Sequence, residues 1–301
     1  MSMNSSLATQ HVVCIGSVLW DIVGRSSRNM ALSHDVPGHI ERRPGGVALN
    51  IAMALASQNL SSTLLSAVGQ DLDGSTLVDQ CIAMGLGTEL LYRPTDLPTD
   101  QYMAIEAENG LVAAIADAHS LEKAGDHILA PLSDGRLGSE KAPYAGLVAL
   151  DGNLTAELLD EMSQSPLFCN ADLRIAPASP GKAKRLLPFV KNSRGTLYVN
   201  LIEAEILCQQ KFDNSTLAAK ALLAKGAARV LVTDGGRDAS FADAEICVSH
   251  TPPAVTVTRI TGAGDTFMAA HIAAEATGAT PDIALQRALE SAARYVSEGS
   301  Y

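Results

Sequence analysis

A glycine-rich segment near the C-terminal end holds the residues best suited to chemistry. The tripeptide Gly262-Ala263-Gly264 precedes Asp265, and the alanine-rich stretch 267–276 that follows predicts a helix. The β-branched run 255–258 before them favours a strand. N–H groups at the start of a helix bind anions, and Asp265 beside them could accept a proton from a substrate hydroxyl. This pattern suits phosphoryl transfer to an alcohol, although a tight turn with an aspartate cap has the same residues.

Composition narrows the class of protein. The chain has 301 residues, 47% of them hydrophobic, which is enough for a large buried core. A formal net charge of −11 disfavours binding to nucleic-acid polymers. The five cysteines are odd in number and widely spaced, which argues against a disulfide framework or a zinc site. Since no signal-peptide core or membrane-spanning run occurs, we expect a cytoplasmic protein that does not associate with membranes.

The N-terminal part places polar residues after a predicted strand. The apolar run 11–17 predicts a buried parallel strand, and Asp21 follows it, near the edge where open parallel sheets bind ligands. Asp21 could equally be a turn or cap residue. Farther on, the pair Gly45-Gly46 leads directly into an alanine-rich predicted helix at 51–58. Backbone can approach a ligand closely at such glycines, and Asn50 in the first turn could reach the same ligand.

One region interrupts the alternation of strands and helices. Asn109-Gly110 separates two β-compatible runs, 102–107 and 111–116, which predicts an antiparallel hairpin. A hairpin inside an α/β chain indicates a small accessory sheet. We expect this sheet to form a lid over the site from segments 19–43 and 90–117.

The second half returns to a regular alternation. Strands are predicted at 146–150, 167–171 (with Asp172 at its end), 196–199 and 229–233, and helices at 155–162, 182–190 and 217–225. Roughly eight strand–helix units predict a single α/β domain over 1–301, a three-layer, doubly wound and mostly parallel sheet that carries the β lid.

Four motifs follow one another in the order and at the separations typical of one kinase family. Along the chain they are Gly45-Gly46-x-x-x-Asn50 with Gly69-x-Asp71-x-x-Gly74, then Asn200-x-x-Glu203, Thr233-x-Gly235, and Thr261 to Phe267. Over nearly its whole length the chain resembles the ribokinase-like (PfkB) family of carbohydrate and nucleoside kinases. Within that family it is most similar to pseudouridine kinases, on stretches 36–40, 114–117, 151–154 and 200–205.

The resemblance implies a role for each matching residue. Asp265 would take the proton from a primary, 5′-type hydroxyl, while Gly262, Ala263 and Gly264 would donate N–H groups to the γ-phosphoryl oxygens. Thr233, Gly235 and Thr261 would line the nucleotide, and Asn200 and Glu203 would hold Mg²⁺, through water. The ribose hydroxyls would contact Asp21, Gly45, Gly46 and Asn50, with Asp151 or Asn153 nearby. Closure of the lid would exclude water as a competing acceptor.

The resemblance further implies ATP and Mg²⁺ as cofactors and a homodimer that pairs through the lid.

Three residues depart from the usual pattern of the family or stand out for another reason. Arg259 occupies a position where the family often has an acidic residue, which leaves the need for a monovalent cation such as K⁺ open. Asp238 stands where a second glycine is common in the nucleotide loop. Trp20, beside Asp21, could stack on a substrate base or simply pack at the edge of the lid.

Several alternatives remain for the function. The substrate could be pseudouridine, another nucleoside, ribose, fructose or a keto-deoxy sugar acid. A non-catalytic sugar or nucleotide sensor could keep the fold, but its usual mark would be loss of the base, and Asp265 is present. A dinucleotide oxidoreductase is disfavoured because the first predicted strand ends in Gly16-Ser17 without a G-x-G-x-x-G pattern.

Overall fold

The computed structural model describes residues 11–31 and 33–297 and contains two β-sheets. The larger sheet has eight strands in the order β12-β11-β10-β9-β8-β7-β1-β4. Their bounds are β1 (His11–Ile15), β4 (Ser61–Leu65), β7 (Leu147–Asp151), β8 (Asp172–Ala176), β9 (Thr196–Asn200), β10 (Arg229–Asp234), β11 (Arg237–Ala242) and β12 (Cys247–His250). The six strands from β10 to β4 are parallel, and β11 and β12 are antiparallel additions at one edge.

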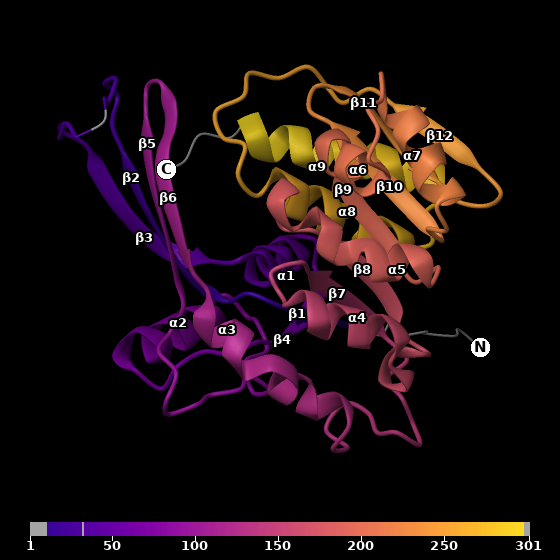
Figure 1. The fold of residues 1–301 in the computed structure, drawn as a ribbon, viewed down its shortest axis with the longest axis horizontal. Coiled ribbons are helices and arrows are strands. Elements are labelled where there is room, and N and C mark those ends of the chain that lie inside the picture. Colours follow the sequence, from indigo (N-terminus) through magenta and orange to yellow (C-terminus); the bar gives the residue numbers. More distant parts are fainter. Residues whose placement is uncertain (1–10, 32, 298–301) are drawn as a thin grey trace, which may run out of the picture.

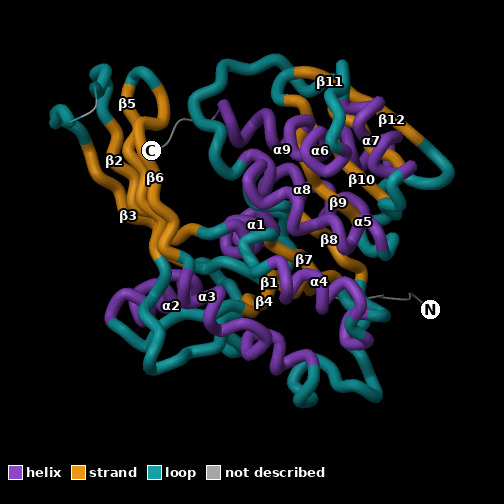
Figure 2. Tube along the Cα trace, viewed as in Figure 1, coloured by secondary structure: helices purple, strands orange, loops and turns teal. Residues whose placement is uncertain are grey.

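Helices cover both faces of the large sheet (Figures 1 and 2). One layer comprises α1 (Val47–Ser57), α2 (Leu72–Ala83), α8 (Ala263–Ala276) and α9 (Pro281–Ser297). The other comprises α3 (His119–Ala124), α4 (Ala156–Gln164), α5 (Leu187–Lys191), α6 (Leu201–Cys208) and α7 (Ser215–Ala224), with 3₁₀ turns at Gly125–Leu132, Pro166–Phe168 and Pro180–Leu186. Both faces of the sheet are apolar and need a cover, as strand β1 illustrates. Its side chains alternate, so Val12 and Cys14 pack under the first layer and Val13 and Ile15 under the second. The predicted three-layer, mostly parallel architecture is confirmed.

The smaller sheet has the strand order β3-β2-β5-β6. Its strands are β2 (Leu19–Arg25), β3 (His39–Gly45), β5 (Gln101–Ala107) and β6 (Gly110–Asp117), and they project away from the helical layers in Figure 1. The hairpin expected at Asn109-Gly110 is present, and Gly110 supplies the positive φ of 99° that the turn requires. We call these four strands the lid sheet.

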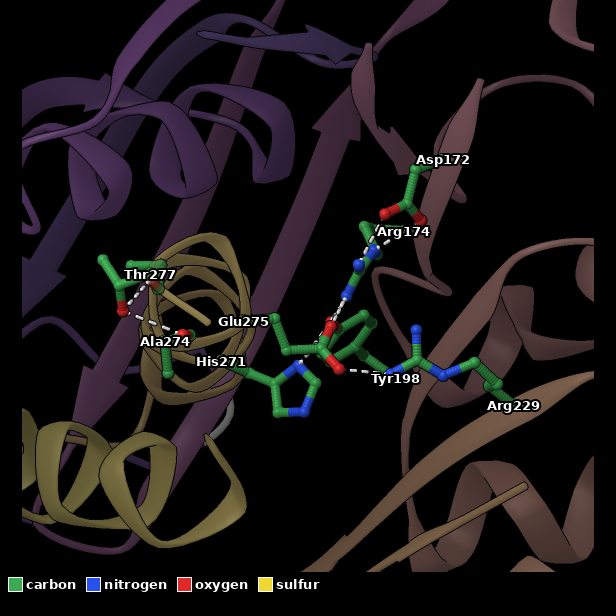
Figure 3. A network of polar contacts seen from close by, with 9 residues as sticks. Asp172, Arg174, Tyr198, Arg229, His271, Ala274, Glu275 and Thr277 are labelled. Carbon is green, nitrogen blue, oxygen red and sulfur yellow. Dashed lines mark hydrogen bonds and ion pairs between the residues drawn. The ribbon is translucent and has the colours of Figure 1, made fainter. Parts of the chain in front are cut away.

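A buried polar network fixes the C-terminal half of α8 to the large sheet (Figure 3). Arg174 on β8 pairs with Glu275 of α8 and with Asp172, and Arg229 on β10 pairs with the same glutamate. The hydroxyl of Tyr198 lies 2.9 Å from Nδ1 of His271, one turn before Glu275. Burial lowers the pKa of His271 to about 4, so this imidazole is neutral at pH 7.

Two predicted strands are wrong. Residues 255–258 form a loop whose end binds α9, with the N–H of Thr258 donating to the carbonyl of Val296 at 2.8 Å. Residues 167–171 lie largely in a 3₁₀ turn that Ser165 caps, and strand β8 starts only at Asp172, which the prediction had placed at a strand's end. In the described part of the chain, no helix is long and apolar enough to cross a membrane.

Candidate active site

The candidate site lies at the carboxyl ends of the parallel strands, where β1 pairs with β7 on one side and β4 on the other. The chain order reverses there, and open α/β sheets bind ligands at such a switch point. Gly16, directly after β1, has φ 146°, and a Cβ there would lie 2.3 Å from Cβ of Asp151 at the end of β7. Only glycine therefore allows the two strand ends to come so close.

Asp151, which the resemblance places near the ribose hydroxyls, is fully buried at the end of β7. Its Oδ2 accepts hydrogen bonds from the N–H and the hydroxyl of Ser17, at 2.8 and 2.5 Å, and from Nδ2 of Asn153 at 3.0 Å. Its Oδ1 accepts from the N–H of Asn153 at 2.8 Å. Asp151 thus holds Ser17 and Asn153 in place, and Asn153 remains at the half-buried rim of the site.

Ser17 in turn positions the start of α1. Its Oγ accepts from the N–H of Val47 at 2.8 Å, and its carbonyl accepts from the N–H of Leu49 at 3.3 Å. A Cβ on Gly46 (φ 96°) would lie 2.5 Å from the Ser17 carbonyl oxygen. The double glycine therefore lets the helix start approach the end of β1. This contact brings Asn50, in the first turn of α1, to the same edge of the sheet.

The start of α8 forms a turn with unpaired N–H groups, which we call the anion hole. Gly262 caps the helix with φ 89°. The N–H of Ala263, predicted to donate to the anion, donates here to the carbonyl of Ile260 at 3.1 Å. Within the described residues, the N–H groups of Gly262, Gly264 and Asp265 have no such acceptor, and a Cβ on Gly264 would meet open space. These three donors and the helix dipole favour a bound anion.

Asp265 lies beside these donors, and the side chain of Asn50 is close enough to its carboxylate to favour the ionised form. Burial raises the pKa of Asp265 to about 7. The polar side chain of Asn50 opposes this rise, while the charges of Asp151 and Asp21 add to it. A carboxylate with a pKa near 7 can accept a proton at physiological pH, as a general base requires.

Asp21 reaches the site from the lid sheet. Burial raises its pKa and the charge of Arg43, its partner across β2 and β3, opposes the rise. A Cβ on Gly45 would lie 2.2 Å from Oδ2 of Asp21, so this glycine makes room for the carboxylate. The neighbouring Trp20 is buried: its Nε1 donates to the carbonyl of Asp73 at 3.0 Å. Trp20 therefore packs at the base of the lid and does not stack on a substrate.

Asn200 and Glu203 form a reciprocal capping box at the start of α6, at the carboxyl end of β9. Asn200 Oδ1 accepts from the N–H of Glu203 at 2.9 Å, and Glu203 Oε2 accepts from the N–H of Asn200 at 2.8 Å. Burial raises the pKa of Glu203 to about 6, so the carboxylate is largely ionised at pH 7. The cap engages one carboxylate oxygen and leaves Oε1 outside the reciprocal pair.

The predicted nucleotide residues lie on two neighbouring segments. Thr233 is near the end of β10, and Gly235 takes φ 59° in the turn to β11. Asp238, which replaces a glycine common in the family, accepts from the hydroxyl of Thr251 at 2.5 Å and so holds the start of the loop that leads to α8. Thr261, in that loop, accepts from the hydroxyl of Tyr295 through its carbonyl at 2.9 Å.

Two polar residues at the site escaped the sequence analysis. Ser17 stood in a Gly-Ser pair that indicated only the end of a strand. Lys182 belonged to a segment predicted as a basic helix, yet its ammonium group contacts Oδ1 of Asn153. Burial lowers the pKa of Lys182. The Pro180-Gly181 pair before it was the available signal, since such a pair marks a turn, and here it begins the 3₁₀ segment that carries Lys182.

The family follows from comparison with known proteins. The profile of the pfkB family of carbohydrate kinases matches residues 9–300. The chain belongs to this family. It is therefore a phosphotransferase that acts on a hydroxyl group, and both the predicted fold and the resemblance are confirmed.

Individual relatives agree with this assignment. The chain is 31% identical over 271 residues to an uncharacterized sugar kinase, YeiI, of Escherichia coli K12, covering 86% of this chain and 71% of that protein. It is 28% identical over 268 residues to the pseudouridine kinase of the same organism, covering 86% and 82%. A solved structure, a putative ribokinase II from E. coli in complex with ATP and Mg²⁺, superposes with a TM-score of 0.77 at 17% identity, over 96% of this chain and 93% of that one.

Proposed function

We propose that this pfkB-family kinase transfers the γ-phosphoryl group of ATP to the primary, 5′-type hydroxyl of a ribosyl substrate, with pseudouridine as the first candidate. One observation carries the proposal. The Asp265 carboxylate, with the side chain of Asn50 close to it, stands beside the unpaired N–H groups of Gly262 and Gly264. A base and an anion hole side by side suit a reaction that depends on positioning and charge stabilisation.

The preference for pseudouridine rests on similarity to the E. coli pseudouridine kinase and on the sequence stretches 36–40, 114–117, 151–154 and 200–205. The first stretch leads into lid strand β3, the second lies on β6, and the third contains Asn153. We propose that the base of a nucleoside would contact the lid sheet. Ribose, fructose, a keto-deoxy sugar acid and other nucleosides remain the competing substrates.

In this proposal each residue has one task. Asp265 accepts the proton of the hydroxyl as its oxygen attacks the γ-phosphorus, and Asn50 orients that carboxylate. The N–H groups of Gly262, Gly264 and Asp265 stabilise the charge on the transferring group. Asp21, with Asn153 at the rim, holds the ribose hydroxyls, and Thr233 and Gly235 line the nucleotide.

Mg²⁺ fits the residues present, and it would neutralise charge between the phosphates of ATP. No group of three or more His, Cys, Asp or Glu side chains in the described chain could form a protein cage for a metal. A single carboxylate, that of Glu203 in the capping box, is enough to bind an ion that keeps most of its water ligands. Asn200 and Glu203 would hold it through those waters. The guanidinium of Arg259 already supplies positive charge near the anion hole, so we expect equal turnover in K⁺ and Na⁺ buffers.

The test is turnover of Mg·ATP with pseudouridine, uridine, ribose, fructose and a keto-deoxy sugar acid, with the phosphate position read by ³¹P NMR. We expect pseudouridine to give the highest kcat/KM and Asp265→Asn to lower kcat by about 10³-fold or more while ATP still binds. A better sugar substrate would overturn the substrate assignment, and turnover that survives Asp265→Asn would overturn the base. Ligands that raise Tm without any turnover would favour the sensor.

We further propose that the lid sheet pairs with that of a second copy. Ile40, Met103 and Ile115 are 81%, 47% and 69% exposed. The register places them on one face, because Gly24 pairs with both Ile40 and Ile105, and Met103 pairs with Ile115. Asp21 and Tyr102 point to the opposite face. An exposed apolar face of this kind favours association with another apolar surface. The lid sheet of a second copy, related by a two-fold axis, would present an identical apolar face to it. Ile115→Lys should therefore convert a dimer to a monomer in analytical ultracentrifugation, and a wild-type monomer would contradict the proposal.

A further inference from the structure

The loop that leads into the anion hole is fastened to the end of α9. The N–H and hydroxyl of Thr258 donate to the carbonyl of Val296 at 2.8 and 3.0 Å. Nε of Arg259 donates to the carbonyl of Tyr295 at 2.8 Å. These acceptors belong to the last turn of α9, where carbonyls lack helical partners and carry partial negative charge, so a guanidinium binds there favourably.

Tyr295 contacts both Arg259 and the turn that forms the anion hole. The Arg259 guanidinium lies over its ring, 3.6 Å from the centroid. Its hydroxyl donates to the carbonyl of Thr261 at 2.9 Å. A Cβ on Gly262 would lie only 2.4 Å from that hydroxyl oxygen. The tyrosine therefore touches the residue whose N–H opens the anion hole, and it does so at a contact that only glycine permits.

Packing alone does not hold this loop. Residues 255–258, 260 and 261 are exposed and pair with no strand. A cavity of about 490 Å³ lies beside the loop, and Arg259, Gly262 and Tyr295 contribute to its wall. Donors that stabilise a transition state must be held in position before the reaction, because reorganising them during it costs free energy. A loop without sheet pairing or close packing needs another source of rigidity.

We propose that Arg259 and Tyr295 are positioning residues that fix the anion hole through Gly262. The inference rests on the proposed function and names what holds its anion hole in place. Arg259 holds the loop against α9 by stacking on Tyr295 and by its hydrogen bond to the Tyr295 carbonyl. The Tyr295 hydroxyl, through its hydrogen bond to the Thr261 carbonyl, fixes the position of the turn before Gly262. Neither side chain needs to touch the nucleotide.

The test compares Tyr295→Phe, Arg259→Gln and Arg259→Lys with Arg294→Gln. Tyr295→Phe keeps the ring under Arg259 and removes only the hydroxyl. Arg294 is an exposed arginine on the same helix that lines the same cavity, so its variant controls for lost charge. The readouts are kcat with the acceptor that wild type uses best, Tm, and the affinities for ADP and for a non-hydrolysable ATP analogue.

In the proposed function the anion hole contacts only the γ-phosphoryl group, so we expect a displaced hole to weaken binding of the ATP analogue but not of ADP. We expect Tyr295→Phe to lower both kcat and the ratio of ATP-analogue to ADP affinity by about 3- to 10-fold, the worth of one hydrogen bond. Arg259→Gln should lower both further, with partial recovery in Arg259→Lys, whose ammonium cannot stack as a planar fork does. The double variant should lose less than the product of the single losses, since both residues act on one loop.

Two results would overturn the inference. One is an affinity ratio and a kcat within about two-fold of Arg294→Gln in all three variants. The other is a lower Tm with an unchanged affinity ratio, which would mark the pair as structural only. Nucleotide affinities do not depend on the acceptor, so the ratio remains informative even if no ribosyl compound proves to be a substrate.

Discussion

Asn50, in the first turn of α1, lies close enough to the carboxylate of Asp265, in the first turn of α8, to favour its ionised form. Two helix N-termini meet at this contact, and both dipoles favour a negative charge there. Burial and the charges of Asp151 and Asp21 favour the protonated acid instead. The balance places the pKa of Asp265 at about 7, in the range where a carboxylate serves as a base at physiological pH.

Asn50→Ala should shift the pH dependence of activity to higher pH. The side chain of Asn50 lowers the pKa of Asp265, so its removal raises that pKa above about 7. Only the carboxylate form accepts a proton, so kcat/KM rises with pH, and its midpoint should move up by about one pH unit. Ser57→Ala, at an exposed position of the same helix, should leave the midpoint unchanged. An Asn50→Ala midpoint at or below that of wild type would contradict the role of the contact.

Asp265→Asn should stabilise the protein at high pH. Burial raises the pKa of Asp265 from 3.8 to about 7, so between those values the folded state holds a proton that the unfolded chain releases. The wild type therefore loses stability as pH rises from about 4 to about 7. Asparagine does not ionise, so the Tm of the variant relative to wild type should be higher at pH 8 than at pH 5, by about 2 °C or more. Asp96→Asn, at an exposed position, controls for the charge, and an equal difference at both pH values would argue against the raised pKa.

The polar residues at strand ends and helix starts could be placed from the sequence because their motifs are local. Asn200 and Glu203 form a capping box within one turn, and Gly45-Gly46 with Asn50 occupy one helix start. The parallel sheet then brings these local features to a common edge. The hairpin at Asn109-Gly110 is equally local, since the turn itself demands its residues.

What the sequence could not supply depends on contacts between distant segments. The run 255–258 has the composition of a strand, but the chain leaves the sheet after His250 to reach α9. The burial of Asp151 requires Gly16 and Ser17 to close over it, and no local pattern specifies that contact. The N–H of Ala263 donates to the carbonyl of Ile260 within a turn, so it is not free to donate to an anion, and a glycine-rich motif alone does not reveal this turn.

Glu203→Gln should weaken the binding of Mg²⁺ without unfolding the start of α6. Glutamine retains an oxygen that can accept from the N–H of Asn200, so the cap persists, but it carries no charge to attract a hydrated cation. We expect about a ten-fold higher Mg²⁺ concentration at half-maximal activity, and a similar shift in the Mg²⁺ dependence of ATP binding, with an unchanged Tm. Glu205→Gln, on the same helix and paired with Lys211, is the matched control. Equal Mg²⁺ dependence in both variants would remove Glu203 from the metal site.

Arg174→Met should destabilise the fold while the turnover of folded molecules stays near that of wild type. Arg174 is 4% exposed and holds Asp172 and the half-buried Glu275 at the end of α8 remote from Asp265 (Figure 3). Removing one partner of a buried ion pair leaves the others uncompensated and costs about 3–5 kcal/mol. The loss is measured by urea denaturation, with kcat corrected for the folded fraction.

The control for this change is Arg136→Met. Arg136 pairs with Asp134 at 2.6 Å, but both side chains are exposed, so its loss should cost at most about 1 kcal/mol. Adding Glu275→Gln to Arg174→Met should recover part of the stability, because it removes one buried charge that lost a partner, although Arg229 then loses its own. A loss in Arg174→Met no greater than in Arg136→Met would show that the network contributes little. A fall in kcat per folded molecule would instead show that the network positions Asp265 along the length of α8.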